Sequence, residues 1–288
     1  MIHNGAQPTA VTQGARVASQ DELYLDLLAQ VLTRTIDMEH LVPAPTPVTK
    51  SRRAAFRLLN KALGRRGMLI ARETTYDKRA AGWDWPRQAE TMVGLARLEN
   101  VRQCVTDVIR CGVPGDLLEA GVWRGGVGIY MRAILAASGD TTRKVWLADS
   151  FQGLPPPSGN FDADIGDKCH RWPELAVSLD DVKHNFERYG LLDDQVEFLP
   201  GWFNDTLPSA PVDTLAVLRC DGDMYESTIV TLESLYPKVS PGGYVIVDDY
   251  GALPQCKAAV DDFRAQHRIN DRMESVDWTG VYWRRNGT

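Results

Sequence analysis

LEAGVWRGG, residues 118–126, is the stretch that decides the fold of this 288-residue chain. It places an E-x-G-x-x-x-G loop between a short apolar run and a stretch with helical periodicity. Glycines there let the backbone approach a ligand, and the helix N-terminus offers free N–H groups. The G-x-G-x-x-G signature of nicotinamide dinucleotide binding is absent, and so is the G-K-[ST] ending of a phosphate-binding loop. An acid at the strand end, Glu119, instead favours a ligand with a sulfonium and an amino group, S-adenosylmethionine (SAM).

The pattern continues outward from this loop as short apolar runs that alternate with helical stretches. Predicted strands span residues 116–120, 144–148, 195–199, 214–220 and 243–247, with a hairpin over 272–284. Predicted helices span residues 126–137, 178–190, 227–235 and 254–267. Five strand–helix units followed by a hairpin predict an α/β protein with the Rossmann-like, seven-stranded sheet of a class I methyltransferase.

The N-terminal third has a different character, and we divide the chain accordingly. Residues 1–20 form a polar, disordered tail, 21–112 a helical region, and 113–288 the methyltransferase domain. Within the helical region, helices are predicted over 22–35 and from Glu90 through Val101. Residues 50–72 hold eight Lys or Arg and no acid. They predict an amphipathic helix on a lid or arm, which either is simply solvated or recruits an anionic partner.

Composition limits the class of protein. The chain has 32 basic and 38 acidic residues, a net charge of −6, which argues against nucleic-acid binding. No apolar run approaches the ~20 residues of a membrane span, and the first residues lack a secretory pattern. Five cysteines without a C-x-x-C pair favour a reducing cytoplasm.

Carboxylates follow several predicted strands. Asp221 ends the fourth strand, and Asp248 and Asp249 end the fifth. Neighbouring strands lie ~4.8 Å apart, so these three acids can converge and bind Mg²⁺ or Mn²⁺. Such a metal would lower the pKa of a bound hydroxyl and ease transfer of its proton to a nearby carboxylate. Asp223 is expected to cap the helix that follows.

The second and third strands supply further candidates for the cofactor site. Asp149 closes the second strand, where an acid can bind both hydroxyls of a cofactor ribose. Trp202 and Phe203 follow the third strand, where they either stack on adenine or pack in the core. The tryptophans are otherwise expected mostly in the core.

Together these motifs resemble the macrocin/mycinamicin/novobiocin-type sugar O-methyltransferases of actinobacterial natural-product pathways. The resemblance runs from about Tyr24 to Trp283. It is carried by WPRQAETM (85–92), EAGVWRGG (119–126), DSFQGLP (149–155), GWF (201–203), RCDGDMYEST (219–228) and GGYVIVDDY (242–250).

The resemblance implies SAM- and Mg²⁺-dependent methylation of a deoxysugar hydroxyl on an antibiotic or similar product. It implies that Asp221, Asp248 and Asp249 hold the metal, with Asp221 as the general base. It further implies a homodimer or higher homo-oligomer whose N-terminal helices form a lid. The SAM site would comprise Glu90, Thr91, Met92, Glu119, Gly121, Trp123, Asp149, Ser150 and Trp202.

Three other functions stay open at this point. Asp221-Gly-Asp223 spells D-x-D, a metal motif of glycosyltransferases. A non-catalytic SAM-binding module is the second alternative, and methylation of a non-sugar hydroxyl is the third. The basic segment at 50–72 looks longer than in the sugar enzymes, so the acceptor is the least determined part of the prediction.

Overall fold

A twisted sheet of seven strands forms the centre of the molecule. The computed structural model describes residues 19–38, 40–44 and 49–287, so the predicted tail lies almost wholly outside the described residues. The strands follow the order β5-β4-β3-β6-β7-β9-β8. The first five in this order pair parallel with their neighbours, and β9 pairs antiparallel with both β7 and β8. Their bounds are β3 Asp116–Ala120, β4 Val145–Asp149, β5 Val196–Pro200, β6 Leu215–Cys220, β7 Val239–Val247, β8 Met273–Ser275 and β9 Val281–Arg284. The predicted class I methyltransferase fold with a terminal hairpin is confirmed.

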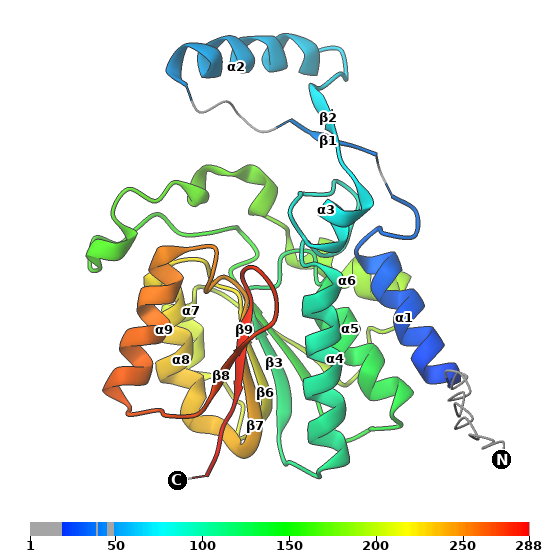
Figure 1. Cartoon of the computed structure of the whole chain (residues 1–288), viewed down its shortest axis with the longest axis vertical. Coiled ribbons are helices and arrows are strands. Elements are labelled where there is room, and N and C mark those ends of the chain that lie inside the picture. Colours follow the sequence, from blue (N-terminus) through cyan, green and yellow to red (C-terminus); the bar gives the residue numbers. More distant parts are fainter. Residues whose placement is uncertain (1–18, 39, 45–48, 288) are drawn as a thin grey trace, which may run out of the picture.

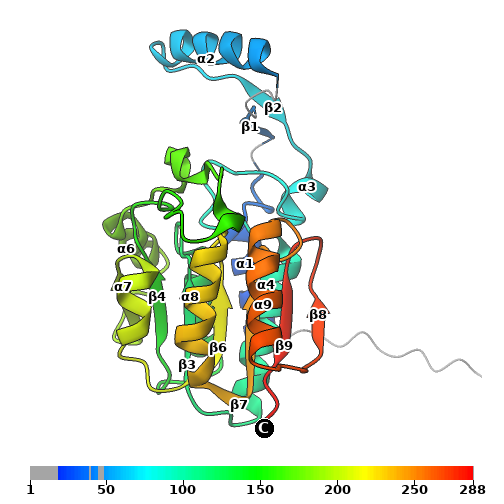
Figure 2. The ribbon, with the colours of Figure 1, turned by 90° about the vertical axis from the view of Figure 1, so that its left-hand side faces the viewer.

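Helices cover both faces of this sheet (Figures 1 and 2). On one face, α1, α4, α5 and α6 share a buried cluster with β3 and β6. On the other face, α8 and α9 pack on the sheet beside the short α7. The bounds are α1 Gln20–Leu32, α4 Leu95–Arg110, α5 Gly126–Ala137, α6 Leu179–Arg188, α7 Phe203–Thr206, α8 Tyr225–Leu235 and α9 Pro254–Gln266. Because both faces are covered, central strands such as β6 are buried along their whole length.

An arm rises above the ends of the parallel strands (Figures 1 and 2). Strands β1 (Leu41–Pro43) and β2 (Ala71–Glu73) pair as an antiparallel stalk that carries α2 (Lys50–Gly64), and α3 (Tyr76–Ala80) follows. The predicted basic helix therefore forms. Its apolar side chains are not packed on the body, since Leu58 is 73% and Leu59 52% exposed.

One predicted helix begins too early. Residues 90–94 are irregular, and α4 starts only at Leu95. Backbone carbonyls of this segment and of the preceding Ala89 accept from distant donors instead of from helical N–H groups. Arg124 donates to the Ala89 carbonyl (2.9 Å), Gly126 N–H to the Glu90 carbonyl (2.9 Å), and Arg79 to the Met92 carbonyl (2.8 Å). Tertiary hydrogen bonds thus hold this segment extended beside the glycine loop.

The long predicted loop after β4 is also present. It crosses the C-terminal edge of the sheet with three single 3₁₀ turns at Asp162–Asp164, Cys169–Arg171 and Pro173–Leu175. Two other 3₁₀ turns lie outside this loop, at Leu207–Ser209 after α7 and at Tyr236–Lys238 after α8.

All five cysteines are free thiols. Among the described residues, none of the helices is both long and apolar enough to cross a membrane.

Candidate active site

The glycine loop brings the ends of β3 and β6 into close contact. Gly121 has a φ of +95°, and a Cβ there would lie 1.7 Å from the Asp221 carbonyl oxygen. Only glycine can occupy this position without displacing the neighbouring strand. Gly125, in the left-handed region, is the N-cap residue of α5, and Trp123 between the two glycines also has a positive φ of 47°. Strained backbone of this kind concentrates at functional sites.

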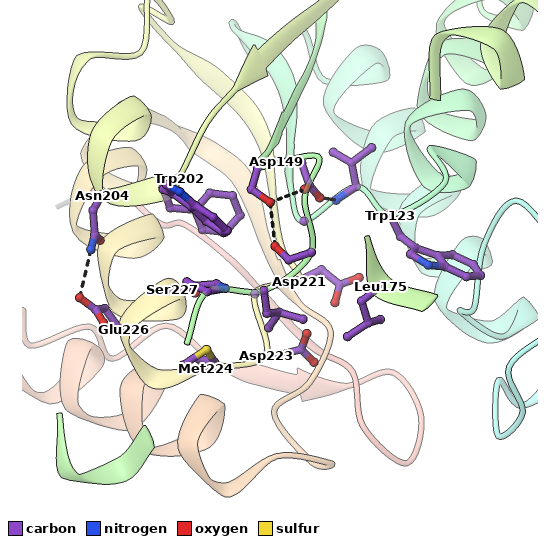
Figure 3. A pocket seen from close by; sticks show the side chains of 18 of the residues that line it. Trp123, Asp149, Leu175, Trp202, Asn204, Asp221, Asp223, Met224, Glu226 and Ser227 are labelled. Atoms are coloured by element: carbon purple, nitrogen blue, oxygen red, sulfur yellow. Dashed lines mark hydrogen bonds between the residues drawn. The ribbon is translucent and has the colours of Figure 1, made fainter. Parts of the chain in front are cut away.

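A cavity of about 450 Å³ opens at the C-terminal ends of β3, β4 and β6, a volume within the ordinary range for small-molecule sites. It is the site that the strand order favours, because ligands of open α/β sheets bind beyond the C-terminal strand ends. Seven of the predicted site residues line it, several of them labelled in Figure 3: Met92, Gly121, Trp123, Asp149, Ser150, Trp202 and Asp221.

Asp149 links the glycine loop to the end of β4. One carboxylate oxygen accepts from the Val122 N–H (2.7 Å) and the other from the Phe151 N–H (2.8 Å). Burial raises the pKa of Asp149, while these backbone donors act in the opposite direction. The Ser150 hydroxyl donates to the Gly153 carbonyl (2.7 Å) and so shapes the next turn. The acid predicted to contact a ribose therefore lies on the cavity wall.

Trp202 stands on the opposite side of this cavity from Trp123 (Figure 3), and Phe203 follows Trp202 in the chain. Both line the cavity and both are partly exposed, although Phe203 also contacts the buried cluster beneath α8. Trp202 lies beside Asp149, whereas the Trp123 indole points away from the cavity centre (Figure 3). Its Nε1 donates to the Glu174 carbonyl (2.8 Å), which ties the glycine loop to the long loop.

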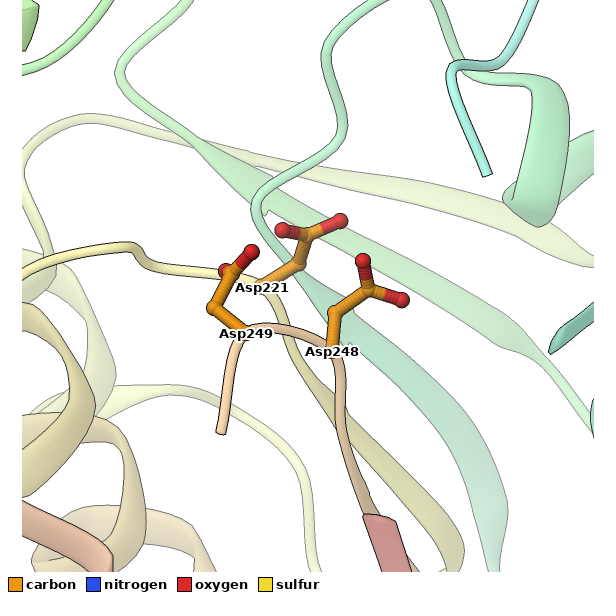
Figure 4. Close-up of side chains that lie close together, drawn as sticks. All are labelled: Asp221, Asp248 and Asp249. Carbon is orange, nitrogen blue, oxygen red and sulfur yellow. The ribbon is translucent and has the colours of Figure 1, made fainter. Parts of the chain in front are cut away.

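Asp221, Asp248 and Asp249 converge at the ends of β6 and β7 (Figure 4). One oxygen from each lies within 4.8 Å of the others. Burial and the charges of Asp223 and Asp221 raise the pKa of Asp249 well above its ordinary range. Asp249 Oδ2 is buried without a hydrogen-bond partner among the described residues. Clustered oxygens of this kind, one of them unsatisfied, suit a hard divalent cation.

Two buried arginines, neither of which was predicted as a site residue, hold this cluster in place. Arg219 on β6 contacts Glu119 (2.8 Å), Asp221 (2.8 Å) and Asp248. Arg97 on α4 contacts Asp248 and also Asp277 (3.1 Å). Burial pushes the pKa of Asp248 up, but the two guanidinium groups outweigh it and hold that pKa below its ordinary value. The pKa of Asp221 is raised, because burial and Asp248 outweigh Arg219.

A second, smaller cavity of about 150 Å³ adjoins the carboxylates on the side of the N-terminal region. Thr91, Met92 and Glu119 line it. Glu119 is fully buried, and burial raises its pKa to about 8 although Arg219 opposes this. Its Oε2 has no hydrogen-bond partner among the described residues.

Glu90 faces neither cavity, unlike the other residues predicted for the SAM site. Its carboxylate instead pairs with Arg34 (3.3 Å), just after α1, and with Arg188 (3.4 Å) at the end of α6.

We expected Asp223 to cap the helix that follows it, but it does not. The N-cap residue of α8, Met224, makes no side-chain cap. Asp164 from the long loop takes this role and accepts from the N–H groups of Tyr225 (2.8 Å) and Glu226 (3.0 Å). Asp223 has a φ of +58° and lines both cavities. Burial and the neighbouring charge of Asp221 raise its pKa to about 7.

The tryptophans also differ from expectation, because most of them are not in the core. Of the eight, only Trp146 and Trp283 are buried. Four are exposed by more than two fifths: Trp83, Trp85, Trp172 and Trp278. Three of these four, Trp85, Trp172 and Trp278, line the smaller cavity.

The strand order and the glycine loop beneath the larger cavity define a class I SAM-dependent methyltransferase. More particularly, the chain belongs to the macrocin O-methyltransferase (TylF) family, whose profile matches residues 21–285. It is therefore an O-methyltransferase, and the glycosyltransferase and non-catalytic alternatives are wrong.

Individual relatives are similar over almost the whole chain. The demethyldecarbamoylnovobiocin O-methyltransferase of Streptomyces niveus is 51% identical over 275 residues, which is 93% of this chain and 95% of the relative. A tetracenomycin-rhamnoside 4'-O-methyltransferase of Streptomyces olivaceus is 50% identical over 267 residues, 91% of this chain and 92% of the relative. The solved structure of the O-methyltransferase NovP superposes with a TM-score of 0.80 at 49% identity, covering 93% of this chain and all of NovP.

Proposed function

We propose that this protein transfers a methyl group from SAM to a hydroxyl of a sugar on a glycosylated natural product of an antibiotic pathway. Transfer depends on Mg²⁺, for which Mn²⁺ can substitute, and Asp221 is the general base. The observation that carries the proposal is the position of Asp221, which lines both cavities. It lies where a methyl donor in the larger cavity would meet a hydroxyl acceptor in the smaller one.

SAM occupies the larger cavity in this proposal. Gly121 supports it, because a Cβ there would close the space between β3 and β6. Asp149 binds the ribose hydroxyls and Trp202 stacks on the adenine, with Met92, Trp123 and Ser150 completing the wall. Thr91 and Glu119 contribute from the adjoining cavity, where the unpaired Glu119 Oε2 can accept from an amino group. Glu90 supports the site from behind through its ion pairs.

Asp221, Asp248 and Asp249 hold the metal. Their oxygens lie within 4.8 Å of one another, and the unpartnered Asp249 Oδ2 is an acceptor that a cation would satisfy. When bound, Mg²⁺ polarises the acceptor hydroxyl and lowers its pKa. Asp248 stays ionised between Arg97 and Arg219 and so supplies a fixed negative charge.

Asp221 receives the proton of the acceptor hydroxyl. Its Oδ2 is held by Arg219 at 2.8 Å, which orients the carboxylate and directs the other oxygen to the acceptor. Arg219 also opposes the rise in the pKa of Asp221 that burial and Asp248 cause. The acceptor oxygen would then form a bond to the SAM methyl group while the bond from that carbon to sulfur breaks in line, and S-adenosylhomocysteine would leave.

Chelation tests the metal, and Asp221→Asn tests the base. We expect EDTA to abolish methylation of a glycoside acceptor and Mg²⁺ to restore it. Asp221→Asn should lose at least ~10²-fold in kcat while SAM affinity changes little. Asp213→Asn is the control and should keep full activity, because Asp213 is exposed and lines neither cavity. Full turnover after exhaustive chelation would refute the metal's role.

A homodimer completes the proposal. The apolar side chains of α2, Leu58 and Leu59 among them, are left exposed on an arm above the catalytic end of the sheet. A partner subunit would cover them, and the N-terminal helices would close over the bound reactants as a lid. Light scattering of the full chain tests this, and a monomer at micromolar concentration would contradict it.

A further inference from the structure

Four tryptophans line the smaller cavity, and the three besides Trp123 come from distant parts of the chain. Trp85 comes from the N-terminal region, Trp172 from the long loop after β4, and Trp278 from the turn between β8 and β9. They are 41%, 45% and 47% exposed. Large aromatic surfaces left open in a cavity mark contact with a ligand more often than with solvent.

The rings are held in place by neighbouring groups. Trp278 Nε1 donates to the Ala81 carbonyl (2.9 Å), and the Arg97 guanidinium lies 5.9 Å from its ring centroid. Trp85 and Trp172 meet edge to face with centroids 5.2 Å apart. A ligand that binds them therefore meets a preorganised surface, which reduces the entropy lost on binding.

The floor of the same cavity is polar. Asp221, Asp248 and Asp249 line it, and Thr279, next to Trp278, donates its hydroxyl to the Asp248 carbonyl (2.8 Å). A tryptophan surface is thus joined through one residue to the carboxylate cluster. The cavity volume of about 150 Å³ equals about five waters at ~30 Å³ each, the size of one monosaccharide ring.

We infer that Trp85, Trp172 and Trp278 form the wall that binds the sugar ring of the acceptor. A sugar has hydroxyls along its edge and a face of C–H bonds that is weakly positive. The indole face is negative, so it attracts that C–H face while the edge hydroxyls reach the carboxylates. This inference rests on the proposed function, because it assigns the acceptor side of the same site.

Single substitutions test the wall. In Trp172→Ala and Trp278→Ala, we expect the KM for demethyldecarbamoylnovobiocin to rise about tenfold or more. The Kd for SAM, measured by calorimetry, should stay within about twofold, which also shows that each variant is folded. Phenylalanine at either position should recover most of the loss. Tyr76→Ala is the control, because Tyr76 is 52% exposed in the same N-terminal region but lines neither cavity.

The outcomes separate the wall from the proposed function. If the wild-type protein binds the glycoside but does not methylate it, and the tryptophan variants lose this binding, the wall is supported and the proposed function is refuted. Methyl transfer with an unchanged acceptor KM in both alanine variants refutes the wall alone. The assignment is also overturned if the wild-type protein binds the sugar-free aglycone as tightly as the glycoside. It is overturned as well if the wild-type protein binds neither this glycoside nor phenyl α-L-rhamnoside.

Discussion

Replacing Arg219 with leucine should reveal how strongly the buried carboxylates at the ends of β3, β6 and β7 depend on one buried cation. Arg219 and Glu119 are each 1% exposed, and the same guanidinium contacts Asp221 and Asp248. Leucine would leave these carboxylates buried without that partner. Breaking a buried ion pair from one side costs about 3–5 kcal/mol, so we expect the free energy of unfolding to fall by that amount. For a chain of this size, Tm should fall by about 6–15 °C.

The loss should also depend on pH in a defined direction. Burial already raises the pKa of Glu119 to about 8, and Arg219 opposes this rise. Without Arg219 the folded-state pKa rises further. A carboxyl whose pKa is raised on folding destabilises the protein above its unfolded pKa, and the cost disappears as pH falls and the group takes up a proton. The gap between variant and wild type should therefore be wider at about pH 9 than at about pH 6.

Urea unfolding followed by far-UV circular dichroism, with EDTA present, measures this gap. Arg110→Leu is the control, because Arg110 pairs with Asp107 on the surface and its side chain is 77% exposed, so unfolding should be nearly unchanged. Adding Glu119→Leu to the Arg219 variant should recover part of the loss. A loss below about 1 kcal/mol, or a gap that narrows as pH rises, would refute the reasoning.

Three further changes test the architecture of the site. Gly121→Ala would place a Cβ 1.7 Å from the Asp221 carbonyl and should abolish SAM binding in calorimetry, whereas Gly139→Ala, also at positive φ but with no atom within 4 Å, should preserve it. Asp164→Ala removes the cap of α8 and should lower the free energy of unfolding by about 1 kcal/mol and speed protease cleavage of the loop that carries it; unchanged cleavage would contradict its anchoring role. Asp149→Ala should raise the Kd for SAM at least about tenfold, because it removes the acceptor of two loop N–H groups and the proposed acceptor of the ribose hydroxyls; an unchanged Kd would place the ribose elsewhere.

Several site residues could be predicted because their positions follow from strand ends alone. Asp149, Asp221 and the pair Asp248–Asp249 each end an apolar run, and parallel strands bring such ends to one edge of the sheet. The glycine loop was predictable for a similar reason, since its spacing between strand and helix is local.

Other features could not be predicted because they depend on contacts between distant segments. Arg97 reaches Asp248 across 151 positions, and no local pattern marks such a pairing. Arg219 left a weaker signal, since a charged residue within a fully buried strand requires a partner. The irregular segment before α4 looked helical because its apolar spacing fits a helix, whereas tertiary donors bind its carbonyls.

The sequence by itself determined the fold class, the positions of the parallel strands along the chain and the acids at their ends, because hydrophobic periodicity and turn residues act locally. Only the tertiary structure decided which carboxylates pair with Arg97 and Arg219, and that an oxygen of Asp249 has no hydrogen-bond partner among the described residues. It also decided that tryptophans from three segments line one cavity. Burial and electrostatic interaction depend on distance in space, and the chain sets that distance only when the sheet, the long loop and the N-terminal region pack together.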